Sequence, residues 1–156
     1  MSEALSVLIV SEERGRASRW AAWLARRGFV SLWCVGPQVN EDCPRLDGRT
    51  CGRRELFDLA LIDLTELPAL EWQSAWPQRF CVKARDDRRS VFVVRPGVSP
   101  SPPLPGLTVT GPVTEHELAR AMHRIARDPR KPRIPGRKGS AAAPTTPRPP
   151  SVRPLV

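Results

Sequence analysis

The chain has 156 residues, 40% of them hydrophobic, which is enough apolar material for one folded core. Its formal net charge is +9, but residues 127–156 contain eight basic residues and one acid and so carry +7 of that charge. The high charge therefore does not indicate a basic folded domain. No stretch approaches the roughly 18 apolar residues of a membrane span, and the N-terminus has no signal-peptide pattern, so we expect a soluble cytoplasmic protein.

The first elements are a strand, a helix and a second strand. Ser6–Val10 is a continuous apolar run rich in β-branched residues, which is typical of a strand buried on both faces of a parallel sheet. From Ser11 onward apolar residues recur at helical spacing, and Gly28 stands where a helix would end. Val30–Val35 then predicts the second strand.

The middle of the chain predicts two more strands. Residues 36–54 are irregular, and Asp58–Leu64 has the most continuous apolar character in the sequence. A short helix is expected after this third strand, ending at Pro77. Ser90–Val94 predicts the fourth strand.

The last elements are a proline-rich loop, a strand and a well-marked helix. Residues 96–106 contain five prolines, so they predict a loop in place of a helix. Leu107–Thr110 predicts the fifth strand. Thr114 and Glu117 have the spacing of a capping box, and the helix that follows them should end near Arg127.

Alternating strands and helices predict a doubly wound parallel sheet, whose sites lie at the carboxyl ends of the strands. We assign this α/β domain to residues 1–127. Residues 128–156 contain eight prolines and almost no large apolar side chain, so we expect a disordered, basic, proline-rich tail.

Two of the strand segments resemble those of response-regulator receiver domains. Leu8–Glu13 looks like the first receiver strand with its acidic pair, and Phe57–Leu64 looks like the strand that presents the phosphoacceptor aspartate. The resemblance implies a flavodoxin-like fold of five parallel strands with the fourth helix reduced or missing. It also implies that Asp63 matches the phosphoacceptor.

A receiver phosphorylates its aspartate with the help of Mg²⁺, which an acidic pair holds. In this chain the pair falls on Ser11 and Glu12, so a hydroxyl replaces one carboxylate. The resemblance therefore implies a Mg²⁺ site of weakened affinity at Ser11, Glu12, Glu13 and Asp63, and we expect no required cofactor.

Two further groups that stabilise the transferred phosphoryl in receivers are replaced. Gly111 stands where a receiver has its lysine, and Val94 or Arg95 stands where it has a hydroxyl residue. Arg95 could supply the missing positive charge, or it could pair with Asp63 permanently. Both substitutions indicate a pseudo-receiver, with Asp63 as a hydrogen-bonded acid.

Three cysteines, Cys34, Cys43 and Cys51, lie close together in the sequence and are a redox or metal candidate. The alternatives are unpaired or buried thiols, a Cys43–Cys51 redox pair, and a metal site. No C-x₂-C motif is present, and the two histidines lie on a distant helix.

Three functions follow from these observations. The first is a non-catalytic signalling or protein-interaction module that is not phosphorylated in the usual way. The second is a phospho-receiver of two-component signalling that accepts phosphate on Asp63 from a histidine kinase, as in a phosphorelay. The third is a nucleic-acid-associated protein whose tail makes weak, nonspecific contact with nucleic acid or an anionic surface. No nucleophile motif or glycine-rich phosphate loop is present, so we do not expect an enzyme.

Overall fold

The computed structural model of the chain describes residues 4–36, 43–44, 51, 56–67, 89–100, 104 and 106–127. These residues build one parallel sheet of five strands in the order β2-β1-β3-β4-β5. The strands are β1 (Ser6–Val10), β2 (Val30–Cys34), β3 (Leu59–Asp63), β4 (Ser90–Val94) and β5 (Leu107–Thr110). This order is that of a flavodoxin-like doubly wound sheet, so the expected fold class is confirmed.

The three central strands are the most apolar segments of the sequence, as a sheet covered on both faces requires. All five residues of β3 and of β4 are buried. The edge strands β2 and β5 instead alternate between more and less exposed positions. In the register, Ile9 of β1 pairs with Leu61 of β3, and Leu61 pairs with Val91 of β4.

Helix α1 (Arg14–Arg26) buries Ala17, Trp20 and Leu24 against the sheet. It starts three residues later than the sequence pattern suggested, because the Glu13 side chain caps it. At its other end Gly28 has a φ of +83°, and the amide of Phe29 donates a hydrogen bond to the carbonyl of Leu24. This is a Schellman ending, which turns the chain into β2.

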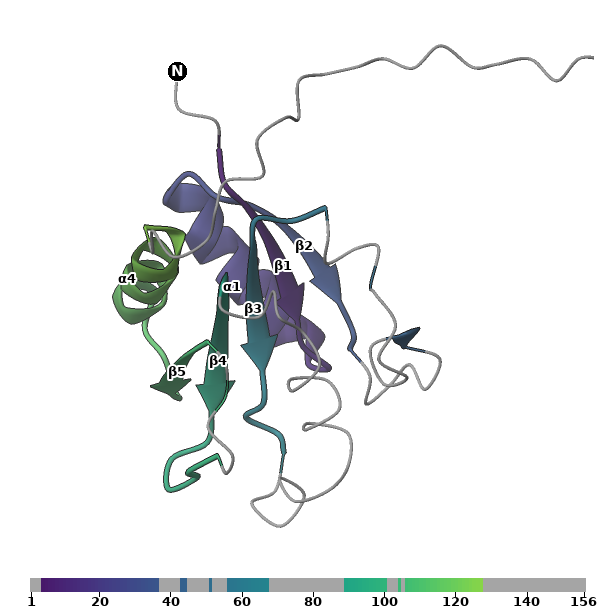
Figure 1. Ribbon diagram of the computed structural model, residues 1–156, viewed down its shortest axis with the longest axis vertical. Coiled ribbons are helices and arrows are strands. Elements are labelled where there is room, and N and C mark those ends of the chain that lie inside the picture. The colour runs from purple at the N-terminus through teal and green to yellow at the C-terminus, as the bar shows by residue number, and fades with distance from the viewer. Residues whose placement is uncertain are drawn as a thin grey trace, which may run out of the picture.

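Helix α4 (Glu115–Ala126) begins with the predicted capping box, in which Thr114 and Glu117 satisfy each other's backbone amides. Its buried face packs beside α1, on the same face of the sheet (Figure 1). The buried side chains of α4 are Leu118, Ala119, Ala121, Met122 and Ile125.

The sheet separates two apolar layers. The first contains the buried residues of α1 and α4 with one set of strand side chains, including Ile9, Leu61 and Val93. The second lies on the opposite face and contains, among others, Leu8, Ile62 and Phe92. Consecutive residues of β1, β3 and β4 point alternately into the two layers, as the pleat of a strand requires.

Several expected elements lie outside the described residues. These are most of the irregular segment 36–54, the short helix expected before Pro77, and the tail at 128–156. In the described part of 95–106, no residue is helical, in agreement with the loop predicted there. Among the helices of the described chain, neither is long and apolar enough to cross a membrane.

Candidate functional site

Asp63 ends β3 at the carboxyl edge of the sheet, where doubly wound proteins carry their sites. Because β1 and β3 are adjacent, Ser11, the residue after β1, lies beside it. The Asp63 side chain is only 2% exposed. The structure therefore brings together two of the predicted site residues in a buried position.

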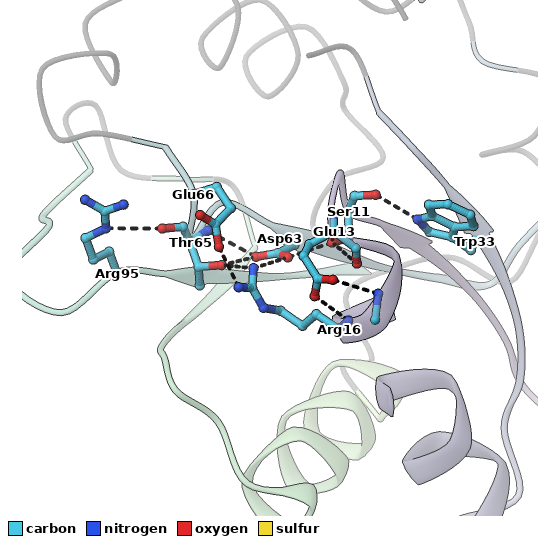
Figure 2. Close-up of polar contacts among 9 residues, drawn as sticks. Ser11, Glu13, Arg16, Trp33, Asp63, Thr65, Glu66 and Arg95 are labelled. Carbon is cyan, nitrogen blue, oxygen red and sulfur yellow. Dashed lines mark hydrogen bonds and ion pairs between the residues drawn. The ribbon is translucent and has the colours of Figure 1, made fainter. Parts of the chain in front are cut away.

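The Asp63 carboxylate accepts four hydrogen bonds (Figure 2). Its Oδ1 accepts from the backbone amide of Thr65 at 3.1 Å and from the Thr65 hydroxyl at 2.5 Å. Its Oδ2 accepts from the Ser11 hydroxyl at 2.7 Å and from Nη1 of Arg16 at 2.8 Å. A carboxylate offers about four lone-pair positions, so these donors engage its whole acceptor capacity.

Arg16, in the first turn of α1, supplies the positive charge of the pocket. Besides Asp63, its guanidinium donates to the Thr65 hydroxyl and to Oε1 of Glu66, the latter at 2.5 Å. Burial alone would lower the pKa of Arg16, but hydrogen bonds and charges from Glu66 and Asp63 outweigh it and raise that pKa. Arg16 is therefore a permanent cation that joins α1 to the loop after β3.

The sequence did not identify Arg16, and it pointed to Arg95 as the cation. The structure corrects this: Nε of Arg95 donates to the backbone carbonyl of Thr65 at 3.2 Å, and its side chain is exposed. Arg95 therefore steadies the loop that follows Asp63, whereas the ion pair with Asp63 belongs to Arg16. One feature of the sequence was compatible with this role of Arg16. It lies in the first turn of the helix that follows β1, and this turn is close to the carboxyl end of that strand.

The two glutamates after β1 differ in what they contact. The Glu13 carboxylate caps α1, accepting from the amides of Gly15 at 2.8 Å and Arg16 at 2.5 Å. Glu12 is exposed.

A Mg²⁺ site needs carboxylate oxygens that can turn to the metal. Glu13 and Asp63 are both engaged by donors of the protein in this arrangement, and the weak Mg²⁺ site stays a prediction. Across the described ranges, no three His, Cys, Asp or Glu side chains are grouped to hold a metal.

Gly111, which the sequence resemblance aligned with the receiver lysine, lies directly beside Thr65. A Cβ atom at this position would lie 3.2 Å from Cγ2 of Thr65, which is a tight contact. The Gly111 amide donates to the carbonyl of Val94 at 2.7 Å, and the following bond to Pro112 is cis. The glycine therefore lets the end of β5 approach the Asp63 pocket closely.

The three described cysteines differ in their surroundings. Cys43 is buried in the second apolar layer and Cys34 packs against that layer, while Cys51 is partly exposed. Cys34, Cys43 and Cys51 form no disulfide in the part of the chain that is described. The Cys43–Cys51 pair is thus not formed here, and a redox or metal role of these residues stays a prediction.

The fold matches solved structures at low sequence identity. A pilus assembly-related protein from Burkholderia pseudomallei is 20% identical with a TM-score of 0.51, and the match covers 79% of this chain and 90% of that chain. A trimeric coiled-coil segment from yeast fused to a second protein is 19% identical with a TM-score of 0.50, covering 81% and 83%. The chain has a flavodoxin-like fold. A response regulator receiver protein from Sinorhizobium medicae is 16% identical with a TM-score of 0.47, covering 80% and 95%.

No protein-family model and no curated protein matches the chain. Because the structural matches are distant in sequence, they describe the arrangement of strands and helices alone. What the pocket does must therefore be argued from its own side chains.

Proposed function

We propose that this chain is a non-catalytic, receiver-like signalling module that binds a protein partner and that phosphorylation does not switch. The observation that carries the proposal is the complete engagement of Asp63 by Ser11, Arg16 and Thr65. A phosphorylated receiver gains and loses a phosphoryl group on its aspartate, whereas here Asp63 forms an ion pair with Arg16.

The chemistry of phosphoryl transfer explains why this engagement matters. For Asp63 to accept a phosphoryl group, a lone pair on one carboxylate oxygen must reach the phosphorus while a metal neutralises the incoming charge. Here each oxygen already accepts two hydrogen bonds, and the side chain is 2% exposed. Attack would first require a donor to move away from the attacking oxygen: Ser11 or Arg16 at Oδ2, or Thr65 at Oδ1.

The Arg16 contacts also suggest what the pocket does instead. Arg16 links α1 to Asp63 and Thr65 after β3, and Arg95 links the end of β4 to the same loop. The N-terminal turn of α1 and the carboxyl ends of β3 and β4 are thereby held together by side chains of the protein itself. Such a pre-ordered surface suits constitutive binding of a partner, because little order is lost on association.

The alternative is a phospho-receiver, and one observation favours it. Arg16 and the Thr65 hydroxyl lie directly against Asp63, and a cation and a hydroxyl are the groups that stabilise a transferred phosphoryl. In this alternative Arg16 would take over the role of the lysine that Gly111 replaces.

Treatment with acetyl phosphate or beryllofluoride in the presence of Mg²⁺ distinguishes the two. We expect the wild-type protein to gain no phosphoryl group by intact mass and to show no Mg²⁺-dependent change in tryptophan fluorescence. Trp33 is a suitable reporter because its Nε1 donates to the carbonyl of Ser11 at 2.7 Å. A phosphoryl adduct that Asp63→Asn abolishes and Arg16→Gln weakens would instead establish the phospho-receiver.

A further inference from the structure

A second candidate site lies at the opposite end of α1 from Arg16. It is an open cleft of about 520 Å³ between the end of α1 and the exposed side of α4. This volume is within the range of ligand sites in proteins, about 300–1,000 Å³. None of its lining residues takes part in the Asp63 pocket.

The walls of the cleft are strongly basic. None of the residues that line it is acidic, and Ala119 is its small apolar patch. Four arginines and two histidines contribute the rest of the lining: Arg27, Arg120, Arg124, Arg127, His116 and His123. His123 is held in place by a ring contact with the buried Phe29, with 4.9 Å between the ring centroids.

Helix stability explains only part of this charge. Arg27 and Arg127 cap the C-terminal ends of α1 and α4, where positive charge is favourable, and Arg27 also lies 3.4 Å from Glu115. Arg120, by contrast, is in the middle of α4. Arg120, Arg124 and Arg127 form no ion pair with any other described residue. Their mutual repulsion would be relieved by an anionic ligand.

We propose that this cleft binds the phosphate backbone of a nucleic acid without sequence preference. Arginine pairs with phosphate in a bidentate manner and is the residue preferred for this contact. Arg120 to Arg127 spans about 10 Å of helix at 1.5 Å per residue. That length covers about three nucleotides at the 3.4 Å spacing of a stacked strand.

The structure favours nucleic acid over the other polyanions. The cleft has one small apolar residue, Ala119, and no large aliphatic side chain among its lining residues that would anchor a protein partner. Insertion into a membrane would need an exposed apolar helix face, whereas α4 buries Leu118, Met122 and Ile125 against the sheet. The sequence after Arg127 adds seven basic residues against one acid, which extends the cationic character along the chain.

Binding of a short fluorescein-labelled single-stranded oligonucleotide to the full chain, followed by fluorescence anisotropy, tests this proposal. The cleft variant is Arg120→Gln with Arg124→Gln, both exposed residues, and circular dichroism checks its fold. The matched control, Arg148→Gln with Arg153→Gln, removes the same charge near the C-terminus. We expect the cleft variant to lose about tenfold in affinity relative to the control. For the cleft variant, the slope of log affinity against log salt concentration should also become less steep by about 1.4, which is 0.7 for each of the two lost phosphate contacts.

Two results would overturn the proposal. Equal losses in the two double variants would show that overall charge, and not the cleft, attracts the oligonucleotide. Displacement of the oligonucleotide by phosphatidylserine vesicles or polyglutamate as effectively as by unlabelled oligonucleotide, at equal charge concentration, would assign the cleft to a membrane or an acidic protein.

Discussion

Asp63 is a buried carboxylate whose charge is balanced by one residue of a neighbouring helix. The Arg16 side chain is 24% exposed and that of Asp63 is 2% exposed, so the pair sits at the boundary between core and solvent. In such a place the desolvation of Asp63 is offset only while its donors are present. Loss of the cation would leave a buried charge with three donors, all uncharged.

Arg16→Gln should therefore destabilise the fold by about 1–3 kcal/mol, the range for losing a hydrogen bond to a charged group that stays buried. Urea unfolding monitored by tryptophan fluorescence measures the loss. Arg19→Gln is the matched control, because Arg19 is an exposed arginine of the same helix and should change stability by less than about 0.5 kcal/mol. Equal effects of the two substitutions would contradict a structural role for the ion pair.

The sequence predicted part of this pocket. Ser11 and Asp63 could be placed together, because both follow apolar strands whose carboxyl ends must meet in a parallel sheet. Arg16 could not be identified, since an arginine on a helix is ordinarily solvated and this contact joins residues 47 positions apart. Glu13 was expected at a metal site. In the structure its carboxylate accepts hydrogen bonds from the first amides of α1, those of Gly15 and Arg16, which have no partner within the helix.

At the scale of the elements, the first turn of α4 contains two glutamates whose negative charge is stabilised by neighbouring groups. Hydrogen bonds from the Thr114 backbone and hydroxyl lower the pKa of Glu117, and a hydrogen bond from Arg26 lowers that of Glu115. Both acids lie in the first turn of α4, where negative charge also favours the helix. At neutral pH the ionised side chains of Glu115 and Glu117 therefore stabilise the N-terminal end of α4.

These lowered pKa values predict an acid-sensitive contribution to stability. As the pH falls, the unfolded chain binds protons at the ordinary carboxyl pKa before the folded chain does. The contribution is complete above that ordinary value and is lost as the pH falls through the lowered one. Glu117→Gln should thus reduce the midpoint of urea unfolding at about pH 7, and the gap to wild type should close toward about pH 3. If the urea midpoints of wild type and Glu117→Gln differed equally at both pH values, the ionised Glu117 carboxylate would not be the source of the stabilisation.

Strands and helices were more predictable than their ends. Three strands, Ser6–Val10, Ser90–Val94 and Leu107–Thr110, have the expected bounds, because each apolar run is bordered by polar or turn residues. The second strand is one residue shorter than expected, and the third lacks one expected residue at each end. Leu64 directly follows β3; it remains buried, and its amide still donates to the carbonyl of Val93.

On the scale of the molecule, the described residues cover the two faces of the sheet with different kinds of element. Both described helices, α1 and α4, lie on one face (Figure 1). The other face nevertheless buries Leu8, Ile62 and Phe92 to 3% exposure or less. Among the described residues that pack over it are Cys43, Val98 and Leu104, which belong to connections and not to helices. A second layer of this kind should contribute to global stability as a true core does.

Three leucine-to-alanine substitutions in strands test this expectation with one chemical change. Leu61 faces the helices and Leu8 faces the second layer, and they are 0% and 3% exposed, whereas Leu32 on the edge strand is 49% exposed. Leu61→Ala and Leu8→Ala should each cost about 2–5 kcal/mol in urea unfolding, because both leave a cavity. Leu32→Ala should cost less than about 1 kcal/mol. A Leu8→Ala variant as stable as Leu32→Ala would mean that the second layer does not pack as a core, and that the helix-covered face alone stabilises the sheet.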